Sequence, residues 1–271
     1  MLSGKDKIVR ANGTDISYYD FGKGHLPIIF FHGFPFDKSM WKPQLDFFKY
    51  AQRVIAYDIR GFGKSTAGVE QISMGLFADD LIGLMDALQI DKAVVCGLSM
   101  GGYILLNAIS RYPERFEAII LSDTQCIADS KEVKVKRNKT IHQLETGGLK
   151  DFADVFVKNI FCQDSLSDKI ILVEEIKKVI LSTDTLTLTR TLNAIAQRRE
   201  MCSSLKEIKV PSLILCGKED TITPPEQAQF LQCNIANSRL YSIEKAGHMS
   251  NLEQASEFNQ HLANFISDLE N

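Results

Sequence analysis

A serine stands where a predicted buried strand turns into a predicted helix. Residues 93–96 are apolar and of a length typical of a buried strand, and apolar residues recur at helical spacing after Ser99. Gly97 and Gly101 flank the serine, and such a turn needs residues without bulk there because the strand and helix backbones converge. A serine in this position has a strained backbone. We therefore expect Ser99 to stand at the apex of the turn as a nucleophile.

A serine hydroxyl is a poor nucleophile until a base takes its proton, and a histidine base needs a carboxylate to fix its tautomer. Of the five histidines, only His248 lies in a polar loop directly after a late predicted strand. His32 is a second candidate, although its H-G-F-P context favours a role in shaping the backbone. Asp220 and Asp123 each follow a predicted strand at the edge where open α/β sheets bind ligands. We favour Asp220 and keep Asp123 open as the alternative. The chain order Ser99, Asp220, His248 is the order that nucleophiles on such turns use.

Acyl transfer also requires hydrogen-bond donors for the negative charge that develops on the attacked oxygen. The backbone N–H of Met100 follows the nucleophile at a helix N-terminus, and the N–H of Phe34 lies in the loop after the strand at 27–31. We predict that these two amides form an oxyanion hole. Apolar side chains of the predicted loops and helices would then line a substrate pocket, and the candidates are Phe34, Phe152, Phe156, Phe161 and Met249.

Strands and helices that alternate along the chain must position these residues. Apolar runs that read as strands occupy residues 27–31, 53–57, 93–96, 116–121, 210–216 and 239–243, and Asn12-Gly13 predicts an opening hairpin. Such alternation predicts an α/β fold with a parallel sheet and helices on both faces. Residues 124–205 show only helical periodicity. We therefore expect a core formed by residues 1–123 and 206–271, with a helical cap inserted at 124–205.

The composition limits the partners of the chain. With 271 residues, 45% of them hydrophobic, and a net charge of −3, the chain can bury one large core but has no excess positive charge to attract nucleic acid or an anionic membrane. We find neither a signal-peptide pattern nor an apolar run that could span a membrane, and we expect a cytoplasmic protein. The six cysteines lack C-x-x-C spacing, and we expect neither a disulfide framework nor a zinc site.

Five segments of the chain resemble, in order, those of the α/β-hydrolase fold family. They are HGFP at 32–35, DIRGFGKS at 58–65, GLSMGG at 97–102, GKED at 217–220 and AGHMSNLEQ at 246–254. The chain is most similar to the carboxylesterases, 3-oxoadipate enol-lactonases and cofactor-free haloperoxidases of that family. The resemblance implies an eight-stranded, mostly parallel sheet with a helical lid over Ser99, and a reaction that needs no metal or organic cofactor.

Three functions compete at this point. The leading hypothesis is a serine hydrolase that cleaves small carboxylic esters or lactones through an acyl-enzyme on Ser99. The alternative is a perhydrolase, in which peroxide replaces water at the acyl-enzyme, and a ligand receptor without activity is a third reading of the same fold. We expect a small-molecule substrate as the main partner and consider a homodimer as one option for assembly.

Overall fold

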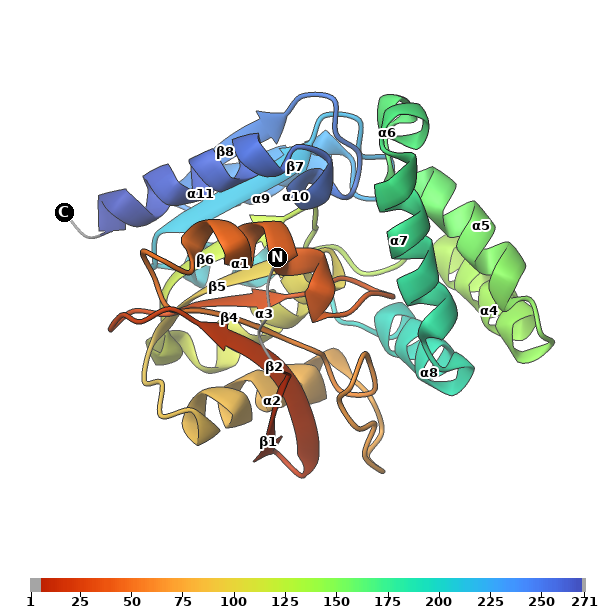
Figure 1. Ribbon diagram of the computed structural model, residues 1–271, viewed down its shortest axis with the longest axis horizontal. Coiled ribbons are helices and arrows are strands. Elements are labelled where there is room, and N and C mark those ends of the chain that lie inside the picture. The colour runs from red at the N-terminus through yellow and green to blue at the C-terminus, as the bar shows by residue number, and fades with distance from the viewer. Residues whose placement is uncertain (1–5, 270–271) are drawn as a thin grey trace.

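The computed structural model of the protein describes residues 6–269, which form an eight-stranded sheet with helices on both faces (Figure 1). The strand order is β1-β2-β4-β3-β5-β6-β7-β8. The strands are β1 (Lys7–Ala11), β2 (Thr14–Phe21), β3 (Ile28–Phe31), β4 (Val54–Tyr57), β5 (Ala93–Leu98), β6 (Phe116–Ser122), β7 (Ser212–Gly217) and β8 (Ser238–Ile243). The predicted fold class is confirmed.

The antiparallel part of the sheet lies at its N-terminal edge. β1 and β2 form the predicted hairpin, and Asn12 and Gly13 both adopt positive φ at its turn. Positive φ at both central residues is what a tight hairpin turn with the right twist requires, and Asn and Gly tolerate it best. β2 pairs antiparallel with β4, and all later pairings from β4 to β8 are parallel.

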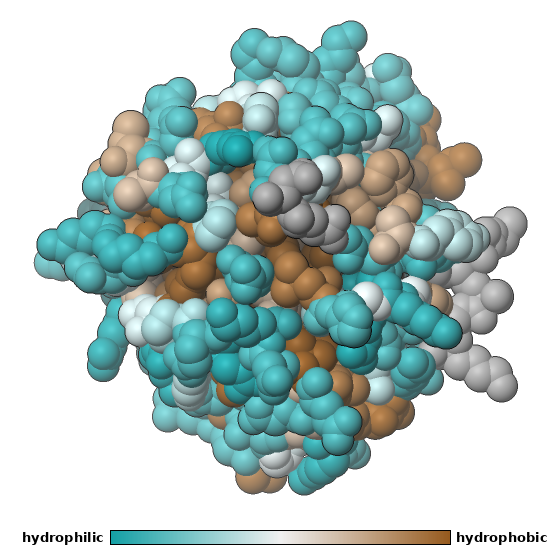
Figure 2. Space-filling model, turned by 90° about the vertical axis from the view of Figure 1, so that its left-hand side faces the viewer, coloured by the Kyte–Doolittle hydropathy of each residue, from teal (hydrophilic) through white to brown (hydrophobic). Residues whose placement is uncertain are grey.

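The central strands are hydrophobic at nearly every position because helices cover both faces of the sheet. β3, β4, β5 and β7 are buried along their full length, whereas the edge strand β8 is largely exposed. The helices around the sheet are α1 (Lys42–Phe48), α2 (Met74–Ala87), α3 (Met100–Arg111), α9 (Pro225–Asn234), α10 (Ser250–Glu253) and α11 (Ala255–Leu269). The face shown in Figure 2 carries mostly hydrophilic side chains, interrupted by smaller hydrophobic areas.

Five helices follow one another between β6 and β7, and Figure 1 shows them together at the right of the molecule. They are α4 (Lys131–Glu145), α5 (Leu149–Ile160), α6 (Gln163–Asp168), α7 (Ile170–Ser182) and α8 (Thr185–Ala196). Residues 124–205 contribute no strand to the sheet. The division of the chain into core and cap stays a prediction, and the connection that it concerns is helical.

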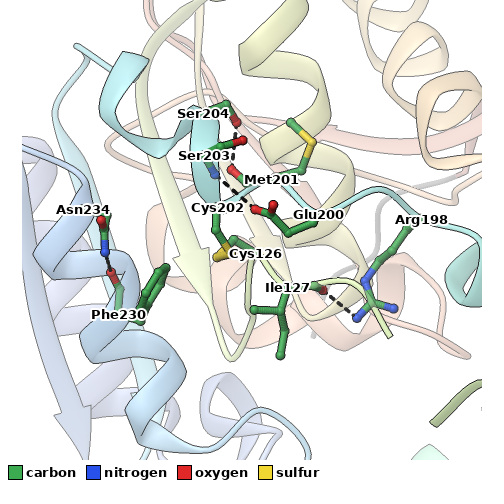
Figure 3. The surroundings of a disulfide bond; sticks show 10 residues. All are labelled: Cys126, Ile127, Arg198, Glu200, Met201, Cys202, Ser203, Ser204, Phe230 and Asn234. Atoms are coloured by element: carbon green, nitrogen blue, oxygen red, sulfur yellow. Dashed lines mark hydrogen bonds between the residues drawn. A yellow bond between two sulfur atoms is a disulfide. The ribbon is translucent and has the colours of Figure 1, made fainter. Parts of the chain in front are cut away.

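The expectation that the cysteines form no disulfide is wrong for one pair. Cys126 and Cys202 are bonded across a sequence separation of 76 residues, just after β6 and shortly before β7 (Figure 3). The backbone N–H of Met201 donates to Cys126 O at 2.8 Å, so the two segments run side by side. The pairing gave no signal in the sequence because the two cysteines are 76 residues apart, and the path of the chain through the helices between β6 and β7 brings them together.

The C-terminal helical segment is interrupted after Glu253. Gln254 has φ −130° and separates α10 from α11. The Gln254 side chain donates to Lys245 O at 3.0 Å, which ties the interruption to the loop before His248. The break therefore forms part of the structure around a candidate site residue.

No helix within residues 6–269 combines the length and the apolar character that crossing a membrane would require.

Candidate active site

Ser99 lies between β5 and α3 with φ 55° and ψ −112°, a strained backbone conformation for a residue with a side chain. A Cβ atom at Gly97 would lie 2.4 Å from Gly101 O, and one at Gly101 would lie 2.8 Å from Phe31 Cβ. Both flanking positions therefore require glycine. At Gly97 the reason is the convergence of β5 and α3 expected from the sequence, whereas at Gly101 it is the close approach of α3 to the end of β3. The N–H of Ser99 donates to Ser122 O at 2.9 Å, which fixes the turn to the end of β6.

Asp220 and His248 meet at the end of the sheet. His248 Nδ1 lies 2.7 Å from Asp220 Oδ2, and both side chains are buried. Asp220 Oδ1 accepts the N–H groups of Ile222 and Thr223, and Oδ2 accepts the Thr223 hydroxyl at 2.8 Å. The carboxylate is thus fixed on its own loop while it orients the imidazole. With Nδ1 bonded to a carboxylate, Nε2 is the nitrogen left to act as a base.

Asp123 is part of the same group of residues, but no hydrogen bond joins it to His248 within residues 6–269. Its Oδ1 accepts Gly217 N–H at 2.8 Å, and its Oδ2 accepts the hydroxyls of Ser122 at 2.7 Å and Ser250 at 2.5 Å. The carboxylate therefore links β6 to the loops that hold Asp220 and His248. The geometry favours Asp220 as the partner of the histidine, and the functional assignment stays a proposal.

Burial and the nearby negative charges change the pKa of His248 in opposite directions. Burial lowers the pKa of His248, but the charge and hydrogen bond of Asp220, together with the more distant charges of Asp123 and Glu253, outweigh burial and raise it. Burial also tends to raise the pKa of Asp220, but His248 outweighs this effect and the pKa is lowered. Burial and the Asp220 charge raise the pKa of Asp123 to about 7. The environment of His248 thus favours the imidazolium ion.

The loops that carry Ser99, after β5, and His248, after β8, are both bonded to the end of β6. Ser99 is bonded to the end of β6, and the loop of His248 is bonded to that same end through Ser250 and Asp123. No hydrogen bond joins the Ser99 hydroxyl to the imidazole among the described residues. Such bonds often tighten only in the complex with substrate, so the arrangement is compatible with proton transfer from Ser99 to His248.

The segments that carry the two predicted oxyanion-hole amides border the Ser99 turn. Met100 is the first residue of α3, where a helix leaves its N–H groups without internal partners. A Cβ atom built on Gly33 would lie 3.4 Å from Ser99 Cβ, so the loop that carries Phe34 contacts the nucleophile turn at the residue before Phe34. The oxyanion hole itself stays a prediction.

His32 is fully buried and holds the backbone, as its sequence context indicated. Its Nδ1 lies 2.9 Å from Gly33 O, and its Nε2 accepts Ile59 N–H at 2.9 Å. Both ring nitrogens are occupied in the neutral tautomer, and burial lowers the pKa of the ring. His32 is thus not available as a base for Ser99.

Three of the predicted pocket residues form an aromatic cluster. The ring of Phe34 lies 6.3 Å from Phe152 and 6.2 Å from Phe156, and those two rings are 5.2 Å apart. Phe161 lies apart from this cluster and lines a surface cavity of about 510 Å³ beside Asp220. Met249 is fully buried next to His248. Phe34 therefore packs with the two phenylalanines of α5, whereas Phe161 and Met249 lie outside this aromatic cluster.

Sequence reasoning missed two residues that contact the loops of this site. Thr223 donates its hydroxyl to Asp220, and Glu253 accepts backbone N–H groups on both sides of His248. Glu253 follows His248 by five residues, and nothing in its local pattern indicated that its carboxylate turns back to the loop. Glu253 ends the short helix α10, and its carboxylate lies against the loop that precedes this helix.

The fold agrees with comparisons to known proteins. Residues 27–161 match the family model of the alpha/beta hydrolase fold. A Synechocystis protein that carries the name of a non-heme chloroperoxidase is 30% identical over 266 residues, which cover 93% of this chain and 95% of that protein. The chain belongs to the α/β hydrolase fold family.

Two further similarities concern enzymes that act on lactones and esters. The chain is 29% identical to 3-oxoadipate enol-lactonase 2 of Acinetobacter baylyi over 250 residues, or 92% of each chain. A thermophilic esterase from Thermogutta terrifontis, solved with malate bound, is 29% identical and superposes with a TM-score of 0.94, covering 98% of this chain and all of that one. These names describe the relatives.

Proposed function

We propose that the protein is a serine hydrolase that cleaves small carboxylic esters or lactones. The observation that carries this proposal is the 2.7 Å contact between His248 and Asp220 at the sheet edge where Ser99 is held in a strained turn. The similarity to an enol-lactonase and to an esterase supports the same reaction class. The cytoplasmic location, the homodimer and the helical cap at 124–205 remain predictions.

The reaction proceeds in two steps on this arrangement. Ser99 Oγ attacks the carbonyl carbon while His248 Nε2 takes its proton, and the N–H groups of Phe34 and Met100 stabilise the negative oxygen of the tetrahedral intermediate. The carbon–oxygen bond to the alcohol then breaks, and the imidazolium returns the proton to the leaving oxygen. Water attacks the acyl-enzyme with His248 as base, which releases the acid and restores Ser99. Asp220 stabilises the imidazolium in both steps.

Labelling and turnover together test the proposal. A fluorophosphonate should label the parent protein at Ser99, and a short p-nitrophenyl ester should be hydrolysed by the parent but not by Ser99→Ala. Ser203→Ala, which changes an exposed serine, is the matched control and should retain both properties. Full activity in Ser99→Ala, or labelling at another residue, contradicts the assignment, and an inactive parent would favour a ligand receptor.

Perhydrolysis is the second candidate, and the similarity to a protein named as a chloroperoxidase favours testing it. Peroxide would attack the same acyl-enzyme in place of water and yield a peracid. Acetate with hydrogen peroxide and a halide acceptor provides the assay, and activity that depends on Ser99 would support this reaction. Halogenation that persists in Ser99→Ala would show that the acyl-enzyme is not involved.

A further inference from the structure

The turn between α5 and α6 is bonded directly to the loop of His248. We call residues 160–162 the α5–α6 turn. His248 N–H donates to Ile160 O at 2.8 Å, so the backbone of the candidate base is held by a residue outside the sheet core. A Cβ atom on Gly247 would lie 2.8 Å from Cys162 N and 2.9 Å from Ile160 O. The two segments are therefore in close backbone contact, which the absence of a side chain at Gly247 permits.

Glu253 completes this contact through its carboxylate. Oε1 accepts Gly247 N–H at 2.8 Å and Met249 N–H at 3.3 Å, so it binds the backbone on both sides of His248. Oε2 accepts Cys162 N–H at 2.8 Å from the α5–α6 turn. One carboxylate, whose residue is only 1% exposed, thus joins three backbone donors from two segments that are 85 or more residues apart in the sequence.

A second link leads from the same region to the loop of Asp220. The hydroxyl of Thr221, the residue after Asp220, donates to Asn159 O at 3.4 Å. In a separate contact, Lys169 Nζ donates to the backbone carbonyl of Glu253. Displacement of the α5–α6 turn would therefore disturb both loops that bring Asp220 and His248 together. The bond between those two side chains depends on alignment, because hydrogen bonds weaken steeply as their geometry departs from the optimum.

We propose that Glu253 is a positioning residue for His248, and that it keeps the imidazole aligned with Asp220 only while the α5–α6 turn is docked against the histidine loop. This inference deepens the proposed function and rests on it for its effect on turnover. Glu253 touches no reacting atom, and it acts through the backbone of residues 247–249. Displacement of the α5–α6 turn would thereby reduce the ability of His248 to accept a proton.

Glu253→Gln tests the coupling because it replaces one carboxylate oxygen with a donor. The amide oxygen can still accept Gly247 and Met249, but the amide NH₂ then faces the N–H of Cys162, and two donors oppose each other. Glu257→Gln makes the same substitution at a partly exposed glutamate four residues later and is the matched control. Hydrogen exchange at residues 160–163 and 247–249 should accelerate together by about tenfold in Glu253→Gln, as expected for a lost bond to a charged group, and not in the control.

Turnover supplies the second measurement. For a short p-nitrophenyl ester at 25 °C, kcat of Glu253→Gln should fall by about 10²-fold with little change in KM, since small misplacements of catalytic groups have effects of this size. The acidic limb of the pH profile should also move to lower pH, because the variant loses the Glu253 charge and because a misaligned Asp220 stabilises the imidazolium less. The loss of kcat at a pH above this limb, where His248 is neutral in both proteins, reports the misalignment alone, whereas a residue that only supports folding would lower Tm and leave kcat at that pH unchanged. Equal kcat, pH limb and exchange in Glu253→Gln and Glu257→Gln would overturn the proposal.

A second pair of variants covers the case in which Glu253→Gln does not fold. Cys162→Pro removes the N–H donor at a φ of −67°, which proline adopts, and Phe161 before it has the extended conformation that proline requires. Cys162→Ala keeps the donor and removes only the thiol. The proline variant should lose turnover as Glu253→Gln does, and the alanine variant should retain it; equal activity of the two would refute the coupling.

The exchange measurement separates this inference from the proposed function. In a Ser99→Ala background, coupled exchange of residues 160–163 and 247–249 can be measured without any turnover. If the coupling is present but the parent hydrolyses no ester, the proposed function fails and the structural link stands. If the parent hydrolyses esters and the coupling is absent, the role given to Glu253 fails alone.

Discussion

Removal of the Cys126–Cys202 disulfide should destabilise the protein through the unfolded state. The bond closes a loop over a sequence separation of 76 residues, for which the chain-entropy model gives about 4.5 kcal/mol at 25 °C, whereas measured disulfides typically contribute about 2–4 kcal/mol. We expect the double variant Cys126→Ser with Cys202→Ser to lose about 2–4 kcal/mol of unfolding free energy. Changing both residues avoids leaving one reactive thiol.

Urea unfolding of the oxidised parent and the double variant provides the assay. The midpoint should fall, and the slope of the unfolding free energy against urea should rise, because the unlinked chain exposes more surface when it unfolds. Cys233→Ser, which removes an exposed free thiol, is the control and should leave both values unchanged. A double variant within about 0.5 kcal/mol of the parent, the range of ordinary surface substitutions, would refute the reasoning. Detection of two free thiols at these positions in the folded parent would also refute it.

Three further predictions concern the candidate site. Asp220→Asn should lower kcat by about 10⁴-fold, the loss known for this change in a serine protease, while Asp123→Asn should cost much less; the reverse order in steady-state kinetics would exchange their roles. Only neutral His248 can accept a proton and its pKa is raised, so kcat/KM should rise with pH along a limb above about 6.5. Asp220→Asn should move that limb to lower pH, and an unmoved limb would show that another group holds the histidine. Phe156→Ala should raise KM for an apolar ester by about tenfold, measured against Phe230→Ala as an exposed control, and equal values would remove α5 from the pocket.

The sequence by itself determined the order of the strands and helices and the nucleophile turn. Continuous apolar runs such as 28–31 and 93–98 identify buried parallel strands, because a sheet covered on both faces leaves no position for polar alternation. Gly97 indicated the close approach of β5 and α3. These features are local, since each depends on residues within a few positions of one another.

Only the tertiary structure decided which distant groups meet. Asp123 and Asp220 both follow strands, and this local pattern does not distinguish them. In the structure Asp220 Oδ2 lies 2.7 Å from His248 Nδ1, whereas Asp123 links the surrounding loops. The Cys126–Cys202 disulfide depends on the return of the chain, after the helices between β6 and β7, to the segment that follows β6. Glu253 reaches Cys162 only because the α5–α6 turn packs against a glycine in the histidine loop. Sequence periodicity records which face of an element is buried, but pairings between segments this far apart follow from the path of the chain in space, which periodicity does not encode.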